Sequence, residues 1–503
     1  MEDLQVKMKV VEAEDGGGGG EPVSPTGQYF NSSAMSISIL IIFESDEALD
    51  DSQALAVVEK LFLPISPRFS SIIIKDENGV QQWKRVNVRL EDHVKTAVFP
   101  AGHHFYDEFV GEYLSTLALE QLPLTRPLWE IHLLKYRTRA SAATAVFKLH
   151  HALGDGFSLM GALFSCLKRA DNPSLPLTFP TARHSPPAAK AGAFIRLCRR
   201  AAKAFEVGVN TVSDFAWAML KSTLLDDDRT PVRSGDPGPE FRPLTVSTVV
   251  FSLQNVRKIK DMLGGTINDV ITGVIFYGIQ LYMHSTINGH HHHHHHRHHL
   301  HEMNSCKKVT ALVLLNTRIV NGYQSVEEMK RPGTKNPWGN QFAFIPVSLP
   351  SSGRGGAGVE LSDPLSFVLK GRQIIRAKRN SFGVLLTGKL LEAIRRHRGP
   401  EVAAAYMHRT LRKTSMTISN LTGPIEQMIM GNNPISNFYF MVVGSPQSLS
   451  ISVVSYMGKL TLAMGTEKGF IDSELLVSSM EKSFQRIFDA AIDGLNIARY
   501  KIN

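Results

Sequence analysis

Residues 147–163, FKLHHALGDGFSLMGAL, constrain the fold of this chain more than any other stretch. An apolar run of strand length ends at two adjacent histidines, His150 and His151, and Asp155 and Gly156 follow within the next five residues. Apolar residues then recur at helical spacing. The stretch predicts a strand, a tight glycine-containing loop and a helix, with both histidines where the strand enters the loop.

Further strand-like and helix-like segments precede this unit. Apolar runs of strand length, several bounded by turn residues, predict strands at 35–43, 70–76, 81–90, 127–134 and 144–149. Apolar residues at helical spacing predict helices at 54–62, around 110–117 and at 157–167. We therefore assign residues 21–172 to a first lobe, preceded by a flexible glycine-containing tail at 1–20.

The composition changes after this lobe. Residues 171–190 carry five prolines and little periodicity, which is typical of a linker. The following segment, FIRLCRRAAKAF from Phe194 to Phe205, has an apolar and a basic face. Such a helix can lie on an anionic membrane or pack against a domain, and both interpretations stay open. We assign 173–242 to a linker that contains this helix.

A second block begins near Pro243 and again mixes the two patterns. Strands are expected at 243–253, 437–443, 449–457 and 459–464, and a final helix carries apolar residues from Leu476 to Ile492. The His-rich tract predicts a disordered loop insertion at 285–305. With hairpin and crossover signals about equally frequent, the sequence predicts a mixed α/β architecture in two lobes, the second at 243–500.

Composition limits the classes of partner and compartment. The formal charge of +9 and pI near 9.3 favour anionic partners such as a phospholipid surface or a phosphate-bearing cofactor, and no nucleic-acid-binding signature accompanies them. Three distant cysteines suit a reducing compartment. The N-terminus lacks the apolar core of a signal peptide. The longest apolar run, Val270 to Met283, is better explained as a buried core helix than as a membrane span.

The HH…DG loop is a candidate catalytic site. A histidine at a strand end can act as a general base near neutral pH. Asp155 could fix the loop or cap the following helix, and Gly156 permits tight backbone geometry. Metal binding is not expected, because adjacent histidines on a strand point to opposite faces. In the alternative interpretation, His150 and His151 are polar loop residues and Asp155 is only a helix cap.

Six short motifs in order give the chain a family resemblance. HHALGDG matches HHxxxDG of the wax ester synthase/diacylglycerol acyltransferase family, which is related to condensation domains and chloramphenicol acetyltransferase-like enzymes. Similar stretches are EPVSPTGQYF, RPLWEIHLL, INDV at 267–270, WGNQ at 338–341 and ISNLTGP at 418–424. The chain resembles the plant branch of this family over roughly residues 21–500. SNLTGP is a looser version of the family motif, and the His-rich tract is an insertion.

The resemblance implies two chloramphenicol acetyltransferase-like lobes with an active-site tunnel at their junction. It implies that His151 is the general base, that His150 is supporting, that Asp155 is structural and that Gly156 sets the loop geometry. No metal and no bound cofactor are implied, and acyl-CoA is the co-substrate.

Six further residues are expected to bind substrate or shape the site. Asn268 and Asp269 would do so from the second lobe, although Asn268 is equally well explained as a helix N-cap. Trp129 is better explained as a packing residue than as a substrate contact. The remaining candidates are Asn340 in WGNQ, and Ser419 and Asn420 in ISNLTGP.

The resemblance implies a long-chain-alcohol O-fatty-acyltransferase, a wax ester synthase that also accepts diacylglycerol. The expected partners are fatty acyl-CoA, a long-chain fatty alcohol, diacylglycerol and a membrane surface, without nucleic acid. The endoplasmic reticulum membrane is the expected location, with peripheral or single-pass attachment, a cytosolic active site, and the plasma membrane as a second choice. The alternatives are an HxxxD-type acyltransferase acting on a soluble alcohol or amine, whose DFGWG motif is missing here, and a catalytically silent lipid-binding relative.

Overall fold

The computed structural model describes most of the chain, at residues 21–77, 80–180, 193–289, 307–317, 338–350, 361–379 and 381–500. The predicted tail and most of the predicted His-rich insertion lie outside the described residues.

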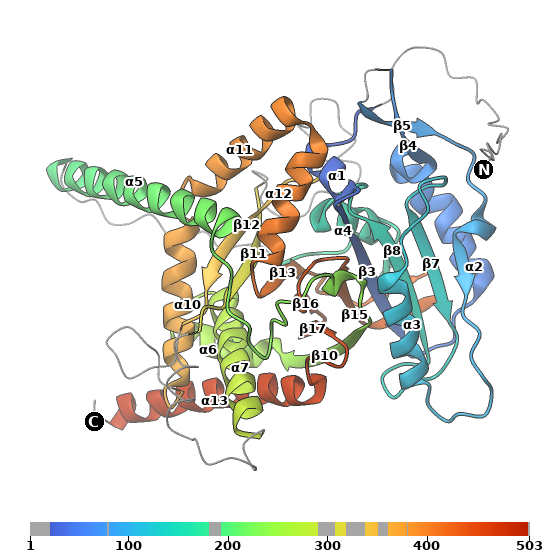
Figure 1. Cartoon of the computed structure of the whole chain (residues 1–503). Coiled ribbons are helices and arrows are strands. Elements are labelled where there is room, and N and C mark those ends of the chain that lie inside the picture. Colours follow the sequence, from blue (N-terminus) through green and yellow to red (C-terminus); the bar gives the residue numbers. More distant parts are fainter. Residues whose placement is uncertain are drawn as a thin grey trace.

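A seven-stranded sheet is the centre of the first lobe (Figure 1). Its strand order is β6-β7-β8-β3-β15-β14-β9, and β8 pairs antiparallel with both β7 and β3. All eight residues of β8 are buried, which explains why apolar residues predominate in this strand. The strands are β3 Ser38–Ser45, β6 Val94–Thr96, β7 Trp129–Leu134, β8 Ala143–His150, β9 Lys168–Arg169, β14 Met428–Met430 and β15 Asn433–Val443.

Shorter elements surround this sheet. Asp50 caps the helix α2, and Asp155 caps α4. The helices are α1 Pro25–Phe30, α2 Asp51–Val57, α3 Asp107–Leu119 and α4 Gly156–Ser165, and the two small hairpins are β1 Asn31–Ser32 with β2 Met35–Ser36 and β4 Ser71–Lys75 with β5 Gln81–Arg85. Single helical turns lie at Val58–Phe62, Leu63–Ile65, Pro67–Ser70 and Leu90–Asp92.

Two strands of the first sheet come from the second half of the chain. β15 pairs antiparallel with β3 over nearly its whole length, and β14 pairs with β9. Phe438 and Phe440 of β15 belong to the same hydrophobic core as Phe43 and Phe147. Residues 428–443 therefore belong structurally to the first lobe, although the sequence boundary at 243 places them in the second. The apolar pattern predicted the strand but carries no information on its pairing partner.

The second lobe is built on a six-stranded mixed sheet with the order β10-β17-β16-β13-β11-β12. β13 pairs in parallel with both β11 and β16, and β17 pairs antiparallel with β10 and β16. The strands are β10 Leu244–Ser252, β11 Thr310–Asn316, β12 Phe342–Ser348, β13 Met416–Thr422, β16 Leu449–Tyr456 and β17 Lys459–Glu467. Both lobes mix parallel and antiparallel pairs, as the predicted mixed α/β class requires.

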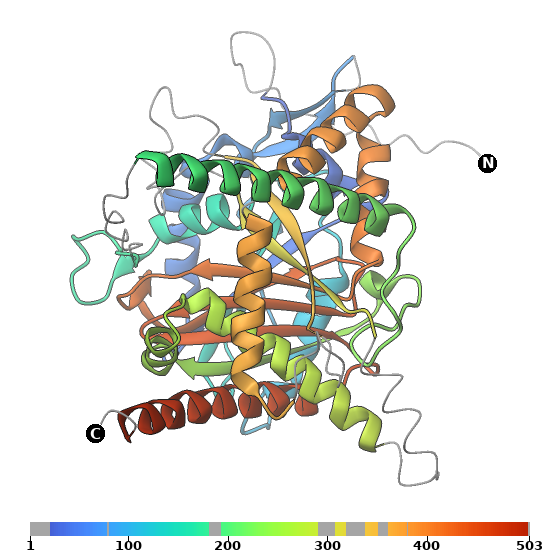
Figure 2. The same cartoon turned by 90° about the vertical axis from the view of Figure 1, so that its left-hand side faces the viewer.

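Helices cover one face of the second sheet, as Figure 2 shows. They are α6 Leu253–Met262, α7 Ile267–Gly289, α10 Pro364–Arg379 and α13 Ser473–Tyr500. Among the described residues, the segment Ile267–Ile287 alone is long and apolar enough to cross a membrane, yet 61% of its most apolar window is buried inside the protein. Val274, Phe276 and Ile279 are completely buried. α7 is thus the core helix that the sequence predicted.

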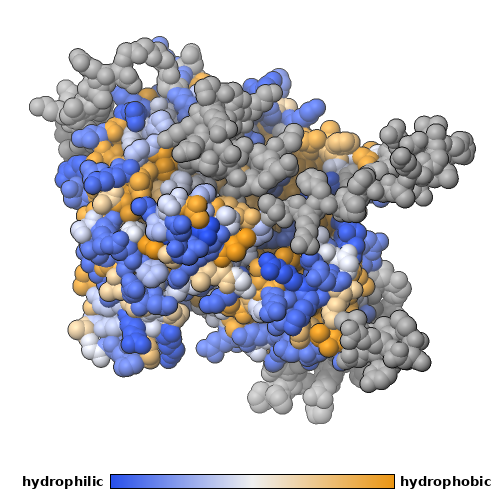
Figure 3. All heavy atoms as spheres, turned by 180° about the vertical axis from the view of Figure 1, so that it is seen from behind, coloured by the Kyte–Doolittle hydropathy of each residue, from blue (hydrophilic) through white to orange (hydrophobic). Residues whose placement is uncertain are grey.

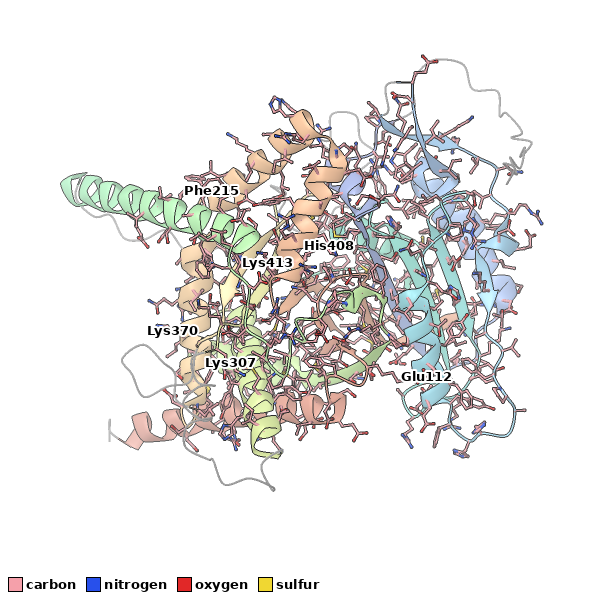
Figure 4. The ribbon with its side chains drawn as sticks, in the orientation of Figure 1. Glu112, Phe215, Lys307, Lys370, His408 and Lys413 are labelled. Atoms are coloured by element: carbon pink, nitrogen blue, oxygen red, sulfur yellow. The ribbon has the colours of Figure 1, made fainter. Side chains whose placement is uncertain are left out.

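Three more helices lie beside the second lobe: α5 Ala193–Thr223, α11 Gly383–Arg398 and α12 Pro400–Arg412. α5 is longer than the helix predicted at 194–205, and its N-terminal part extends away from the body (Figure 1). Lys413, labelled in Figure 4, donates to the Thr223 carbonyl at 2.8 Å, and the hydroxyls of Ser222 and Tyr406 lie 2.6 Å apart. The C-terminal end of α5 is therefore attached firmly to α12.

Candidate active site

His150 and His151 lie at the end of β8, where the chain turns towards α4. The backbone N–H of His150 donates to the Leu128 carbonyl at 3.0 Å, and that of His151 donates to the Ile37 carbonyl at 2.9 Å. Both side chains are buried, at 1% and 3% exposure. The central strands of the first sheet thus fix the backbone of both histidines.

Hydrogen bonds assign the tautomer of His150. The Ala152 backbone N–H can only donate, and it does so to His150 Nδ1 at 3.1 Å. Nδ1 is therefore unprotonated, and the proton of the neutral ring lies on Nε2, which is 3.3 Å from the Ser36 hydroxyl. Burial, followed by the charges of His151 and Lys148, lowers the pKa of His150 to about 3. His150 is a neutral ring that holds the loop to the strand.

Asn340 from the second half of the chain assigns the opposite tautomer to His151. Its Nδ2 donates to the His151 backbone carbonyl at 2.7 Å, so its Oδ1 faces His151 Nδ1, at 2.9 Å. Because Oδ1 can only accept, Nδ1 carries the proton. The lone pair of the neutral His151 ring consequently lies on Nε2.

Two phenylalanine rings enclose the imidazole of His151. The ring centroid of Phe30 lies 4.9 Å from that of His151, and the centroid of Phe342 lies 5.7 Å away. Burial lowers the pKa of His151 below its ordinary value, and the hydrogen bond to Asn340 and the charge of Asp155 oppose this effect. The ring is therefore uncharged at neutral pH and has a partner ready to stabilise a positive charge.

Asp155 both caps the following helix and fixes the loop. Its Oδ1 accepts from the Ser158 backbone N–H at 3.0 Å, and the Asp155 N–H donates to the Ser158 hydroxyl at 3.1 Å, which closes a capping box at the start of α4. Its Oδ2 accepts from the backbone N–H of Gln341 at 2.8 Å. Asp155 thus joins the loop to the segment that carries Asn340.

Glycines allow the two loops to meet. Gly154 forms a bridge with Gly339, which has a φ of +87°. A Cβ on Gly154 would lie 2.4 Å from the Ser158 hydroxyl oxygen, and a Cβ on Gly156 would lie 3.3 Å from Leu421 of β13. A side chain at Gly154 would therefore break the contact between the loops, and one at Gly156 would press on the second lobe.

A cavity of about 260 Å³ opens beside His151, between the two sheets. We call it the front cavity. His151, Asp155 and Gly156 line it from the first lobe, and Ser419 and Asn420 line it from β13. Four of the predicted site residues besides His151 are therefore brought to one cavity.

The INDV residues reach this cavity indirectly. Asn268 Oδ1 accepts from Asn420 Nδ2 at 2.8 Å, so Asn268 positions a residue of the cavity wall. Asn268 is not the helix cap: Thr266 and Asp269 exchange backbone-to-side-chain hydrogen bonds of 2.8 and 3.2 Å at the start of α7. Asp269 also lies 3.9 Å from the Arg372 guanidinium.

Trp129 lies in the core of the first lobe and lines no part of the front cavity. Its indole N–H donates to the Phe69 carbonyl at 2.8 Å, and its ring stacks on His93 with centroids 4.2 Å apart. The preceding residue, Leu128, accepts the backbone hydrogen bond of His150. The PLW motif therefore supports the strand end that carries the histidines.

Comparisons with known proteins agree with this geometry. The family model described as the wax ester synthase/diacylglycerol acyltransferase catalytic domain matches residues 31–271, and the WS/DGAT C-terminal domain matches residues 338–488. The chain belongs to the wax ester synthase/diacylglycerol acyltransferase family. It is therefore an acyltransferase.

Curated relatives match this family member over nearly its whole length. Wax ester synthase/diacylglycerol acyltransferase 4 of Arabidopsis thaliana is 28% identical and covers 93% of this chain and 90% of its own. Wax ester synthase/diacylglycerol acyltransferase 6 of the same plant is also 28% identical, with 93% of each chain covered.

Solved structures share the fold. The wax ester synthase/diacylglycerol acyltransferase from Marinobacter aquaeolei VT8 superimposes with a TM-score of 0.53 at 16% identity, covering 93% of this chain and 99% of that one. The first condensation domain of the CDA synthetase gives a TM-score of 0.53 at 14% identity, with 94% and 96% covered. The expected two-lobed fold of this superfamily is confirmed.

Some residues of the site had no signal in the acyltransferase sequence. Ser36 and Phe342 touch the two histidines but stand in no motif, and Phe30 ends the EPVSPTGQYF stretch, which names no chemistry. Arg68 is buried, and its guanidinium donates to the Leu153 carbonyl at 3.1 Å and to Glu21 at 2.5 Å. Arg68 thus holds the loop through one of its backbone carbonyls. Among the described residues, no group of three or more His, Cys, Asp or Glu is placed to hold a metal ion.

The low pKa of His150 predicts an acid-sensitive fold. In the unfolded chain the imidazole of His150 is protonated at pH values from about 6.5 down to about 3, whereas in the folded protein it stays neutral in this window. The free energy of unfolding should therefore decrease as the pH is lowered through this window, and this residue contributes up to about 1.4 kcal/mol per pH unit to the decrease. His150→Asn keeps an acceptor for the Ala152 N–H but does not titrate. Urea unfolding at a series of pH values should give this variant a shallower pH dependence.

The exposed His104 provides the control, because His104→Asn replaces an imidazole that lies outside the site. Its unfolding should keep the wild-type pH dependence. An unchanged slope in His150→Asn would show that His150 titrates normally in the folded protein.

Proposed function

We propose that this acyltransferase transfers a fatty acyl group from acyl-CoA to the hydroxyl of a long-chain alcohol, which yields a wax ester and free coenzyme A. Diacylglycerol is a second acceptor and yields triacylglycerol. The observation that carries this proposal is the buried, uncharged His151, whose Asn340 contact leaves the lone pair on Nε2 beside the front cavity.

In the proposed reaction, Nε2 of His151 takes the proton of the acceptor hydroxyl. The oxygen attacks the thioester carbonyl carbon, the carbon–sulfur bond breaks, and the coenzyme A thiolate leaves with the proton that the imidazolium returns. Asn340 Oδ1 and the Asp155 carboxylate stabilise the imidazolium while it exists. The protein's own residues therefore suffice for the proton transfers, and no acyl-enzyme is formed.

The neighbouring residues have positioning roles in this proposal. His150 fixes the loop through Ala152 and Ser36, and Asp155 joins α4 to the Asn340 segment. Ser419 and Asn420 lie on the cavity wall opposite the histidine, where their polar groups can contact the thioester or the acceptor. Gly156 keeps the cavity open next to Leu421.

Replacing His151 by Ala should remove the reaction. Purified protein is given radiolabelled palmitoyl-CoA with either hexadecanol or diacylglycerol, and the lipid products are separated. Loss of a general base lowers kcat by roughly 10²–10⁴-fold. His104→Ala, at an exposed histidine next to His103 and outside the site, should keep wild-type activity.

Equal product from His151→Ala and the wild type would remove His151 from the mechanism. No product from either acceptor with a folded wild-type protein would contradict the proposed substrates. In that case a soluble alcohol or amine as acceptor, or a lipid-binding role without catalysis, would be the better account.

We also propose that the protein works on the cytosolic face of the endoplasmic reticulum membrane, attached peripherally. α10 carries five lysine and arginine residues and no acidic one, and Lys370 points away from the body (Figure 4). On the neighbouring α5 and α11, and at the residue before α11, Val212, Leu385 and Phe382 are 71%, 57% and 57% exposed. Figure 3 shows that hydrophobic patches also occur among the hydrophilic residues of the back face. Basic and exposed apolar side chains together suit an anionic lipid surface.

Negative charge introduced at exposed apolar positions of this surface should weaken membrane binding. The double variant Val212→Glu/Phe382→Glu should sediment less with phosphatidylserine-containing vesicles than the wild type, because it adds negative charge and removes apolar contacts. Val98→Glu/Leu124→Glu, at exposed apolar positions of the first lobe, is the matched control. Equal sedimentation of both double variants would argue against this surface.

A further inference from the structure

A short basic stretch between α10 and α11 has a charge pattern that some serine kinases recognise. Residues 378–382 read KRNSF, so a lysine and an arginine stand three and two residues before Ser381, and an apolar residue follows it. Kinases that prefer basic substrates select such a pattern with acidic side chains in their substrate groove. Ser381 is therefore a candidate acceptor of a phosphoryl group. We call residues 378–383 the α10–α11 junction.

The structure distinguishes Ser381 from the other hydroxyls that stand in the same pattern. Two basic residues, any third residue and then a serine or threonine occur at three places in the chain, with Thr310, Ser381 and Ser415 as the acceptors. Thr310 and Ser415 are 2% and 0% exposed, and both donate to Asp227 inside the second lobe. Ser381 is partly exposed, and the next residue, Phe382, is an exposed apolar side chain. Of the three acceptors, a kinase can reach Ser381 without unfolding the lobe.

The Ser381 hydroxyl lies between the start of α11 and the side of α5. α5 crosses the α10–α11 junction in both views of the ribbon (Figures 1 and 2). Ser381 Oγ accepts from the backbone N–H of Gly383, the first residue of α11, at 2.9 Å. It lies 3.5 Å from the carbonyl oxygen of Asn210 in α5, which is too long for a strong hydrogen bond. α5 therefore holds this hydroxyl only weakly.

An ion pair beside Ser381 attaches α5 to α10. Lys378 Nζ lies 2.5 Å from Asp214 Oδ1, and the two side chains are only 18% and 17% exposed. A Cβ on Gly383 would lie 3.1 Å from Ser381 Oγ and 2.9 Å from the Cβ of Asp214. The Ser381 hydroxyl and the Asp214 side chain are therefore close neighbours, on either side of the start of α11.

We propose that Ser381 is a regulatory phosphorylation site whose phosphate releases α5 from the α10–α11 junction. In the modification, Ser381 Oγ forms a bond to the γ-phosphorus of ATP, and the bond from that phosphorus to the ADP oxygen breaks. A carboxylate of the kinase takes the hydroxyl proton, and ADP leaves.

The phosphate competes with Asp214 for its cation. A phosphoserine carries a charge of about −1.5 to −2 at pH 7 and three strong acceptor oxygens, so it attracts the neighbouring Lys378 ammonium. Asp214 then faces a dianion with its own ion pair weakened, and the repulsion separates α5 from the junction. The C-terminal end of α5 stays attached, because Lys413 still donates to the Thr223 carbonyl.

The same phosphate weakens the proposed membrane contact. Phe382 is adjacent to Ser381, and its backbone N–H donates to the Thr211 hydroxyl at 2.9 Å, next to the exposed Val212. A dianion among these apolar side chains repels anionic lipid and resists desolvation. This consequence rests on the proposed membrane attachment, whereas the modification and the release of α5 do not depend on it.

Incorporation of phosphate is measured first. The purified full-length protein is incubated with the catalytic subunit of cyclic-AMP-dependent protein kinase and γ-labelled ATP, and the modified peptide is identified by mass spectrometry. Ser381→Ala should incorporate roughly tenfold less label than the wild type. Ser174→Ala is the matched control, because Ser174 is exposed but has no basic residue in the three positions before it. Absence of label from the wild type, or equal label in Ser381→Ala, would overturn the proposal.

Hydrogen–deuterium exchange then measures the release of α5. In the phosphorylated wild type, backbone amides of residues 206–216 should exchange roughly tenfold faster than before phosphorylation, while those of α6 keep their rate. Asp214→Asn lacks the repelled carboxylate, so phosphorylation should change its exchange by less. Unchanged exchange in the phosphorylated wild type would overturn the release of α5.

Sedimentation with phosphatidylserine-containing vesicles separates this inference from the proposed membrane attachment. Phosphorylated wild type should sediment less than the unmodified protein, and kinase-treated Ser381→Ala should sediment like the untreated variant. Faster exchange of α5 with unchanged sedimentation would contradict the proposed membrane surface and leave the phosphorylation switch supported.

Discussion

The arrangement of the site depends on one hydrogen bond, from His151 Nδ1 to Asn340 Oδ1. The two residues are 189 positions apart. His151 follows a strand of the first sheet, and Asn340 precedes a strand of the second sheet. The amide of Asn340 forms hydrogen bonds with both the ring and the backbone carbonyl of His151. The orientation of this amide is therefore fixed, and the tautomer of His151 follows from that orientation. The adjacent His150 is held in the opposite tautomer by a backbone donor.

The fold makes this contact possible by interleaving the two halves of the chain. β15 crosses into the first sheet and pairs with β3, whose neighbour β8 carries the histidines. The Gly154–Gly339 bridge and the Asp155–Gln341 hydrogen bond then hold the two site loops together. The candidate site between the two lobes therefore needs little movement to assemble, since buried contacts on both sides of His151 already define it.

The sequence predicted the local structure around the site well, because strand, loop and helix depend on neighbouring residues. β8, the capping role of Asp155 and the buried helix α7 all follow from periodicity and cap chemistry. The sequence did not predict long-range contacts, because no pattern in it assigned β15 to the first sheet or Asn340 to His151. Asn268 shows the same limit, because its amide bonds Asn420 on β13 and leaves the helix cap to Thr266.

The most direct test of this account is the pH dependence of kcat/KM for Asn340→Asp. A carboxylate still accepts the Nδ1 proton but stabilises the imidazolium more strongly than an amide does, so the pKa of His151 should rise. The acid limb of the profile should then move to higher pH relative to the wild type, while Nε2 keeps its lone pair. An acid limb at the wild-type position, together with wild-type kcat, would show that Asn340 does not control the base.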